Sequence, residues 1–440
     1  MKRLVLKGFA VTFFVFATMK GVSWLTDLKL FNAFDPISQA LSEFELTDWV
    51  FSKLRSEPTP DERIVIVNIA PNRRAIAEQI RIINQYHPRV IGVDSFFNCE
   101  GGLTDTLNCP QLLDTLGNLL LSNAISEAQN VVLVSRLLQT DSLSHSGTID
   151  VYDSIEYSDE MFRSNAVNAF ANLVTLNKAT YQEDVKICKT FTPKLEVNGK
   201  DEIAFAARIA LMYDSTKALR LFRRNKDEEI INFRGNAEIP DVKIKTQREK
   251  MEGSAEFHVL CYALDWRQLF NGEYLPVMFE DKIVIIGFLG NYLGDPSWSD
   301  KFFTPLNSKV AGRANPDMFG AVVHANIVAM ILNEDYVNEI PEWLQFMIAF
   351  IICFGNVYLL NWVDKRFPIW FDGLQVIIQI IEILIVSVVI VFVFAWFNFK
   401  LDLTLTIAAM ALIGPCFDVY KSLENTVVKR LQKAKPLFNA

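Results

Sequence analysis

The sequence predicts an α/β fold class, in which a mostly parallel sheet flanked by helices is joined to four transmembrane α-helices, one N-terminal and three C-terminal. Two observations predict it. Apolar runs long enough to cross a bilayer lie near the two ends of the 440-residue chain. Between them, β-branched runs alternate with segments of helical periodicity. The composition, 51% apolar and 21% charged, fits a chain that is partly membrane-embedded and partly exposed to water.

The four predicted spans are residues 4–25, 343–362, 374–396 and 401–420. Lys20 interrupts the first span, and its amine can reach the outer interface. A cleaved signal peptide is the alternative for this segment. No small-x-small cleavage site follows the apolar core, which favours an uncleaved signal anchor. The fourth span contains Gly414-Pro415, which predicts a kink near its inner end.

Basic residues predict the orientation. With four spans, Lys2-Arg3, Lys365-Arg366 and the basic tail after Tyr420 all fall on one side, which the positive-inside rule makes cytoplasmic. We therefore expect a multi-pass protein of the cell inner membrane, with both termini cytoplasmic and the central domain periplasmic. The expected parts are a signal anchor (1–26), an extracytoplasmic domain (27–340), a three-helix transmembrane bundle (341–420) and a short basic cytoplasmic tail (421–440).

The first half of the central domain reads as strand, helix, strand, helix, strand. Residues 63–69, 90–97 and 131–135 are the β-branched runs expected of strands that are buried on both faces. Helices are predicted at 73–86, where Ile76, Ile80 and Ile83 recur at helical spacing, and at 112–128. This order implies parallel strands joined by right-handed crossovers.

The second half is less regular. Residues 145–165 are rich in Ser and Asp and are expected to wrap the surface. Beyond them we predict helices at 203–212 and 320–332 and strands at 230–234 and 282–287.

Six cysteines are divided between the parts. Cys353 and Cys416 lie in spans, whereas Cys99, Cys109, Cys188 and Cys261 lie in the exported region, where an even count permits disulfides. Cys99 and Cys109 bracket a Gly-rich loop, so we expect them to pair and to leave Cys188 with Cys261. Four free thiols are the alternative. No CxxC or HxxxH accompanies the cysteines, so no metal site is expected.

Seven blocks of this central region carry a family resemblance. The blocks are ERIVIVNI (62–69), PRVIGVDSFF (88–97), VVLVS (131–135), IINFRG (230–235), DKIVIIG (281–287), DKFFTPL (300–306) and FGAVVHAN (319–326). In this order they resemble the CHASE2 extracellular sensor domain over about residues 27–335, and three closely spaced helices follow, as is usual in that family.

The resemblance implies an output as well as a fold. CHASE2 domains usually receive a signal outside the cell for a cyclase, histidine kinase or Ser/Thr kinase that is fused after the third C-terminal helix. Twenty residues follow Tyr420 here, which are too few for a catalytic domain. We therefore expect any output to come from a separate partner.

No motif predicts chemistry. The sequence has no Walker A motif, G-x-S-x-G elbow or kinase set, and none of the four histidines has metal-ligand spacing. We therefore expect no catalytic residues, no metal, no cofactor and no enzyme activity. The net charge of −8 and the absence of a central basic face argue against nucleic acid as a partner.

The best candidates for ligand binding lie where strands end. Asp94 closes a predicted strand, and Asp295, Asp300 and Thr304 follow the last one, so all four belong near the carboxyl edge at which α/β sheets bind ligands. Asp94 has an alternative role, capping a turn or pairing with an arginine. His324 could sense pH, and the alternative is a hydrogen-bonded structural histidine.

A polar stripe marks the third predicted span. Gln375, Gln379 and Glu382 are four and three residues apart, so they share one helix face, and Asn356 on the second span should lie at a comparable depth. We hypothesise a polar contact between Glu382 and Asn356, or between this face and a partner's helix. The alternative is a protonated Glu382 that reaches toward the near interface.

These observations predict a membrane-bound extracytoplasmic sensor or receptor subunit that relays a periplasmic signal or contact through its C-terminal helices. The expected partners are the lipid bilayer and either a membrane protein or a separate cytoplasmic effector, and a homo-oligomer is compatible with the sequence. The alternative function is a non-sensing structural or docking component of a membrane protein complex.

Overall fold

The chain forms two compact units. Unit 1 comprises Met1–Val50 and Asn338–Ala440, and unit 2 comprises Phe51–Val337. The computed structural model describes residues 2–26, 48, 50–98, 109, 113–140, 152–173, 186–238, 258–307 and 315–434.

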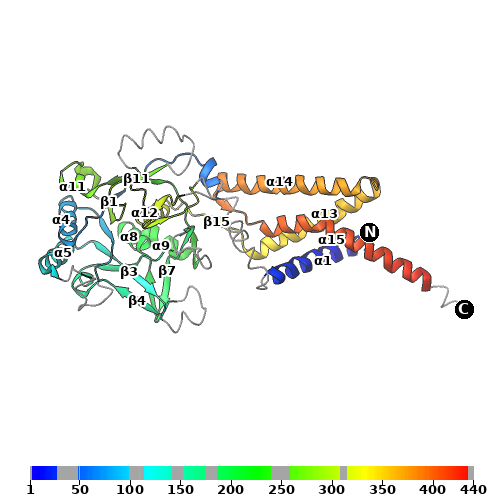
Figure 1. The fold of residues 1–440 in the computed structure, drawn as a ribbon, viewed down its shortest axis with the longest axis horizontal. Helices are drawn as coiled ribbons and strands as arrows, with labels where there is room; N and C mark the ends of the chain where they lie inside the picture. The colour runs from blue at the N-terminus through cyan, green and yellow to red at the C-terminus, as the bar shows by residue number, and fades with distance from the viewer. Residues whose placement is uncertain are drawn as a thin grey trace. The chain divides into compact units, whose positions relative to one another are not determined.

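Unit 2 is built on an eight-stranded sheet (Figure 1). The strand order is β10-β11-β1-β12-β2-β3-β4, and β5 also pairs with β3. Every pairing is parallel except that of β3 with β4. The fold class predicted from the sequence is therefore confirmed. The strands are β1 (Ile64–Asn68), β2 (Val90–Asp94), β3 (Val131–Leu138), β4 (Ser154–Tyr157), β5 (Val167–Phe170), β10 (Asn236–Glu238), β11 (Val259–Leu264) and β12 (Ile283–Gly287).

The central strands are buried on both faces. All five residues of β1 and all five of β12 are buried, and β12 inserts between β1 and β2 in a register that aligns Gly287 with both Asn68 and Asp94. Continuous β-branched runs suit such positions because helices cover both sides of a parallel sheet.

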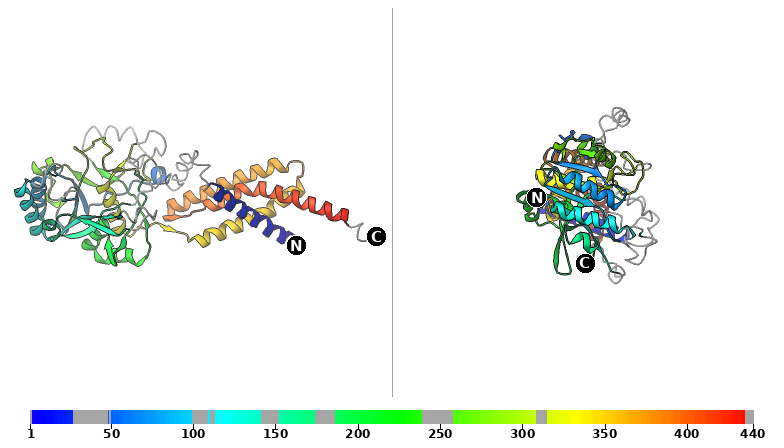
Figure 2. Two further views of the ribbon diagram at one scale, coloured as in Figure 1. Left: turned by 60° about the horizontal axis from the view of Figure 1, so that its bottom comes forward. Right: turned by 90° about the vertical axis from the view of Figure 1, so that its left-hand side faces the viewer.

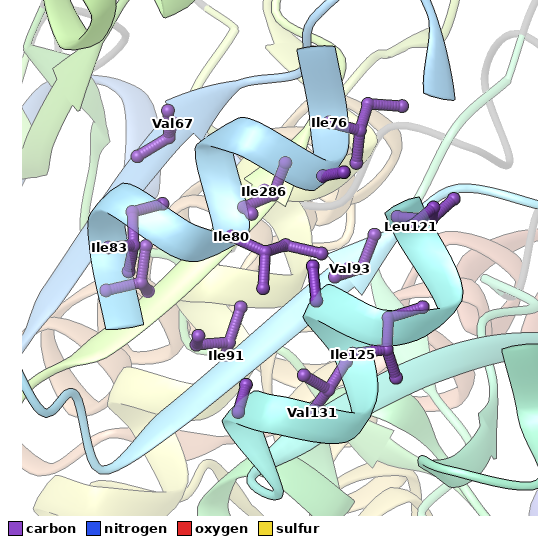
Figure 3. Close-up of a cluster of buried hydrophobic side chains, with 14 of the residues drawn as sticks. Val67, Ile76, Ile80, Ile83, Ile91, Val93, Leu121, Ile125, Val131 and Ile286 are labelled. Atoms are coloured by element: carbon purple, nitrogen blue, oxygen red, sulfur yellow. The ribbon is translucent and has the colours of Figure 1, made fainter. Parts of the chain in front are cut away.

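One face of the sheet is covered by α4 (Arg73–Asn84) and α5 (Thr115–Ala128). Ile76, Ile80 and Ile83 of α4 pack in one apolar cluster with odd-numbered residues of β2 and with α5 (Figure 3). The helical spacing predicted for these isoleucines thus places all three on the side of α4 that faces the core.

The opposite face is covered by α8 (Phe205–Tyr213) and α12 (Gly320–Asn333), against which α9 (Ser215–Arg223) packs. Two strand glycines permit this close packing. A Cβ on Gly92 would lie 2.5 Å from Ile209 Cδ1, and one on Gly287 would lie 2.6 Å from Ala321 Cβ. Glycine is needed at both positions because the helices approach the strand backbone directly.

Short elements complete unit 2. They are the one-turn helices η2 (Val50–Leu54), α7 (Glu160–Arg163), α11 (Trp266–Phe270) and η5 (Pro276–Met278), and the strand pairs β6 (Thr190–Phe191) with β9 (Glu229–Ile230), β7 (Lys194–Val197) with β8 (Lys200–Ile203), and β13 (Lys301–Phe302) with β14 (Met318–Phe319).

Among its described residues, unit 1 has four long helices, α1 (Lys2–Thr26), α13 (Glu342–Arg366), α14 (Phe371–Phe397) and α15 (Thr404–Ala434), which Figure 2 shows from a second direction. A short parallel pair joins β15 (Asn338–Glu339) to β16 (Phe399–Lys400). Within the described residues, three segments are long and apolar enough to cross a membrane, Leu4–Gly21, Glu342–Arg366 and Phe371–Phe397. The crossing by α15 stays a prediction.

The helices of unit 1 share one apolar interior. Val11 and Val15 of α1, Val357 of α13, and Ile413 and Phe417 of α15 belong to one buried cluster. By contrast, α14 leaves most of its apolar side chains exposed, among them Ile377, Ile381, Leu384, Ile385 and Val388. Exposed aliphatic side chains on a helix of this length are suited to contact with lipid.

The predicted Cys188–Cys261 disulfide is wrong. Both are buried free thiols. Cys188 Sγ donates to Thr190 O at 3.7 Å, and Cys261 lies within β11, where it packs as a small apolar residue. Burial raises the pKa of Cys188 to about 12 and also raises that of Cys261. Cys99 lies outside the described residues, so the Cys99–Cys109 pairing stays a prediction.

Candidate functional site

A pocket opens at the carboxyl edge of the parallel sheet. Its volume is ≈ 810 Å³, and its walls come from the segments that follow three adjacent strands and from the start of α11. Parallel strands leave such a crevice because the connecting helices depart to either side. The volume lies within the usual range for small-molecule sites. The walls are residues 69–73 and 76, residues 95–98, Asp114, Trp266 and Arg267, and Phe288, Gly290 and Asn291.

One buried amide fixes the floor of the pocket. Asn68, the last residue of β1, accepts a hydrogen bond from Leu289 N at 2.9 Å and donates to Gly290 O at 3.0 Å and to Asp265 Oδ2 at 3.2 Å. Asn68 therefore ties β1 to the loop after β12 and to the N-cap of α11. The sequence did not single out Asn68, because an amide at the end of a strand is ordinary in sequence.

The turn from β1 into α4 is fixed in a similar way. The buried side chain of Gln79 accepts from Ala70 N at 2.8 Å and donates to Asn68 O at 2.9 Å. Asn72 caps α4 by accepting from Ala75 N at 3.0 Å. Because these bonds hold the turn, the side chain of Arg73 is placed at the pocket wall by rigid elements.

Arg73 is the most deeply buried charged group on the pocket wall, with 6% of its surface exposed. Its Nη1 donates to Asn118 Oδ1 at 2.6 Å, and its guanidinium lies 5.3 Å from the centre of the Phe162 ring. Burial lowers the pKa of Arg73, while Asp159 and Asp114 oppose that shift from a distance. Within the described ranges, no carboxylate lies at ion-pair distance from Arg73.

The other charged residues of the wall are paired. Arg74 Nε donates to both carboxylate oxygens of Asp114, at 2.9 and 2.8 Å. Arg267 Nη1 lies 3.3 Å from Asp265 Oδ1, and its guanidinium stacks 4.4 Å from the centre of the Trp266 ring. Trp266 and Phe288 give the pocket aromatic surface next to these charges.

Among the ligand-binding residues predicted from the sequence, Asp295 is connected to the pocket through a residue of its wall. It is buried and does not line the wall, but it accepts from Asn291 N at 2.9 Å and from Asn291 Nδ2 at 2.8 Å. Hydrogen bonds from Asn291 and Ser297 lower the pKa of Asp295, so its carboxylate stays ionised. Asp295 therefore positions Asn291, which does line the wall.

Asp94 and Asp300 are close enough to influence each other, but neither lines the pocket. Burial raises the pKa of Asp94 to about 6. Burial and the neighbouring charge of Asp94 raise the pKa of Asp300 to about 7, and Lys186 opposes this shift. Asp300 has a positive φ of 54°, and its carbonyl oxygen accepts from Gly320 N, the first residue of α12, at 3.0 Å.

Thr304 and His324 belong to packed regions of unit 2. Thr304 N donates to Asp317 Oδ1 at 2.9 Å, and its hydroxyl bonds the other oxygen of that carboxylate. His324 is buried on α12, where it bonds the backbone of Ala171 and meets the Phe205 ring edge-on at 5.2 Å. Burial lowers the pKa of His324 to about 4, so the ring is neutral above about pH 5. Neither residue lines the pocket.

The polar stripe of α14 turns toward two other helices. The structure brings Asn356 of α13 near Glu382, whose Oε2 atom has no hydrogen-bond partner among the residues that the structure describes. Gln375 Nε2 donates to Asp418 Oδ2 of α15 at 3.0 Å. Gln379 Nε2 donates to Met410 O at 2.7 Å and lies 3.5 Å from Ala411 O.

A proline explains the contact of Gln379. Pro415 lies inside α15 and has no N–H, so it cannot bond the carbonyl of Ala411, four residues earlier. The Gln379 amide reaches this opening in α15 because Gly414 has no side chain. A Cβ on Gly414 would lie 2.8 Å from Gln379 Oε1. A side-chain donor from a neighbouring helix is a standard way to satisfy a carbonyl freed in a membrane helix.

The fold and the pocket define a class of protein, namely a membrane protein that carries an α/β domain with a small-molecule-sized pocket at the carboxyl edge of its sheet. A family model for the CHASE2 domain matches residues 22–359, more than half of the chain. The chain therefore belongs to the CHASE2 family, as its sequence blocks predicted. CHASE2 is an extracellular sensor domain family, which is consistent with a sensor role. No match was found among curated proteins or among solved structures.

Proposed function

We propose that this protein is a sensor subunit of the cell inner membrane, and not an enzyme. Its pocket faces the periplasm and binds a small molecule, both termini are cytoplasmic, and the C-terminal helices relay the bound state to a separate partner. The observation that carries the proposal is the ≈ 810 Å³ pocket at the carboxyl edge of a CHASE2 domain.

Two features support the receptor reading of this pocket. Its loops are held by buried bonds from Asn68 and Gln79, so the site is formed in advance of any ligand. The Gln379 side chain of α14 bonds the backbone of α15, and in our proposal ligand binding changes such contacts between the helices of unit 1.

The relay is tested by photo-crosslinking of the full chain in native membranes. A photoreactive residue replaces Ile381 or Trp396, both exposed on α14, and the adducts are identified by mass. A pocket-filling Ser95→Trp variant and a Ser299→Trp control, which is exposed and lies outside the pocket wall, are compared. A ligand can change the contact with the partner only if the ligand binds one conformational state of the protein more tightly than the other.

We expect a partner adduct whose yield changes at least twofold with Ser95→Trp and is unchanged with Ser299→Trp. An adduct that ignores Ser95→Trp would support the alternative, a docking component that senses nothing. If no partner is crosslinked from either position and none co-purifies in mild detergent, the proposed relay is wrong.

A further inference from the structure

The charges around the pocket do not cancel. Asp114 is paired with Arg74, and Arg267 is paired with Asp265. Arg73 is the remaining charge on the wall, and it has no carboxylate partner at ion-pair distance among the residues that the structure covers. The pocket wall therefore holds one positive charge on which carboxylates, Asp159 and Asp114, act only from beyond ion-pair distance.

That charge is available to a ligand. A guanidinium has five N–H donors, and among the described residues only Nη1 of Arg73 has an acceptor, the neutral side chain of Asn118. Because only 6% of the surface of Arg73 is exposed, bulk water can hydrogen-bond little of its side chain. A buried charge without a partner is costly, and a ligand that supplies the opposite charge removes that cost.

Backbone structure favours the same sign of ligand charge. Arg73 is the first residue of α4, a 12-residue helix whose N-terminal end carries a partial positive charge. The Asn72 side chain occupies Ala75 N, and Arg73 adds its own positive charge at this end of the helix, on the pocket wall.

The remaining wall defines the rest of the ligand. Trp266, Phe288 and Phe97 provide aromatic surface, and Asn291, positioned by Asp295, provides an amide. A purely inorganic anion would leave most of the ≈ 810 Å³ unfilled. The wall suits a molecule with a flat or apolar body and one anionic end.

We infer that the pocket binds a small organic anion, a carboxylate or a phosphate monoester attached to an aromatic or apolar body, with its anionic group on Arg73. The inference rests on the proposed function, because it names the ligand class of the same pocket. Bidentate recognition by arginine accommodates both anionic groups.

The test uses the full chain in lipid nanodiscs, titrated by calorimetry with benzoate, phenyl phosphate and the neutral benzamide. Arg73→Gln removes the unpaired charge. The matched control is Arg81→Gln on the same helix, where the side chain lies 4.0 Å from Glu127 and away from the pocket. Ser95→Trp fills the pocket and leaves Arg73 in place, so it reports on the site even if Arg73→Gln does not fold.

We expect at least one of the two anions to bind the wild-type protein at least tenfold more tightly than benzamide does. The same anion should bind Arg73→Gln on the order of tenfold more weakly than it binds wild type, and it should bind Arg81→Gln as tightly as wild type. Ser95→Trp should abolish binding. Equal affinity for benzamide would overturn the inference, as would unchanged binding to Arg73→Gln or to Ser95→Trp, or no binding of any probe. The crosslinking yields report separately on the relay, so the two failures are distinguishable.

Discussion

At the scale of single residues, carboxylates of unit 2 fall into two groups with opposite behaviour. Asp295 is surrounded by N–H donors that favour its ionised form. Asp94 and Asp300 lie close together in buried surroundings that favour protonation. A raised carboxyl pKa means that the folded state holds a proton that the unfolded chain has already released.

Asp300→Asn should therefore change the pH dependence of stability. The unfolded chain loses the Asp300 proton near pH 4 and the folded state near pH 7, so wild-type stability falls as pH rises through this window. The variant lacks this loss, and its melting temperature relative to wild type should be higher at pH 8 than at pH 5. Thermal scans of unit 2 within the full chain measure this difference.

Asp295→Asn is the control of opposite sign. Its carboxylate has a lowered pKa, so its stabilising bonds are present at neutral pH and are lost as pH falls through the acidic range. This variant should be destabilised more at pH 7 than at pH 3. If the Asp300→Asn variant showed the same pH profile as wild type, the buried-carboxylate interpretation would be refuted.

The two free thiols of unit 2 give a second prediction at this scale. Cys188 and Cys261 are buried with raised pKa values, so the thiolate that reacts with alkylating reagents is scarce and inaccessible. We expect iodoacetamide to modify neither residue in the folded protein and both after denaturation without reductant. Peptide mass spectrometry reads the result. A Cys188–Cys261 disulfide in the purified protein would contradict the structure.

At the scale of elements, the packing of α14 on α15 depends on one small residue and one amide. Gly414 admits Gln379 to the backbone of α15 beside Pro415. The amide bonds Met410 O and lies beside the Ala411 carbonyl, which would otherwise lack a donor in a region with little water. The sequence alone placed Gln379 on a polar face, but it did not show that its partner is a helix opening.

Gln379→Leu should weaken this helix pair. It removes the donor to Met410 and leaves the freed carbonyl unsatisfied, at a cost of about 1–2 kcal/mol. The control is Ile380→Leu, a conservative change on the exposed face of α14. Denaturation of the full chain by SDS, followed by helix-sensitive circular dichroism, compares the variants. Equal midpoints for Gln379→Leu and wild type would show that the contact contributes little.

The strands predicted best are those buried on both faces. β1, β2, β3 and β12 are continuous β-branched runs, and the sequence places all four. β11 was missed because its apolar run has a single β-branched residue, Val259, and contains Tyr262, which is 42% exposed. Conversely, residues 230–234 were predicted as one strand but only Ile230 is in a strand, β9, outside the main sheet. There, the backbone N–H groups of Asn232 and Arg234 donate to the side chains of Met330 and Asn326 instead of to a neighbouring strand.

The sequence predicts where the pocket lies better than it predicts which residues form it. Strand direction alone points to the carboxyl edge, because every connection of a parallel sheet leaves from there. Arg73 and Asn68 carry no local signal, since an arginine in a first helical turn and an amide at a strand end are ordinary in sequence. Their importance follows from long-range contacts, such as that of Arg73 with Asn118, 45 residues away.

At the scale of the whole molecule, the family match does not coincide with either compact unit. It runs from residue 22, inside α1, to residue 359, inside α13, and so includes all of unit 2 and parts of two membrane-length helices. The family thus comprises the domain together with its entry into and exit from the membrane helices. Studies of ligand binding should therefore use the full chain.

The burial of α12 has a consequence for how the protein is made. Every residue from 320 to 332 is buried, and the helix is almost wholly apolar. At 14 residues it is about 21 Å long, too short for the roughly 30 Å hydrocarbon layer. It also contains Asn326, whose amide bonds Gly235 O and Val322 O in the folded domain. With unit 2 on the periplasmic side, as we propose, the chain must pass this segment through the export channel without releasing it sideways into lipid.

His324 and Asn326 should act as safeguards in that passage, because uncovered polar groups are costly in hydrocarbon. Replacing both with Leu should increase the fraction of chains in which α12 is retained in the bilayer, as measured with a topology reporter fused after Asn333. A Val322→Leu/Val323→Leu control keeps both polar groups and should export normally. Unaltered export of the His324→Leu/Asn326→Leu chain would show that length alone protects α12. Increased retention in the bilayer would instead give the polar side chains that complete the folded core a second role, in keeping the newly made chain on the correct route.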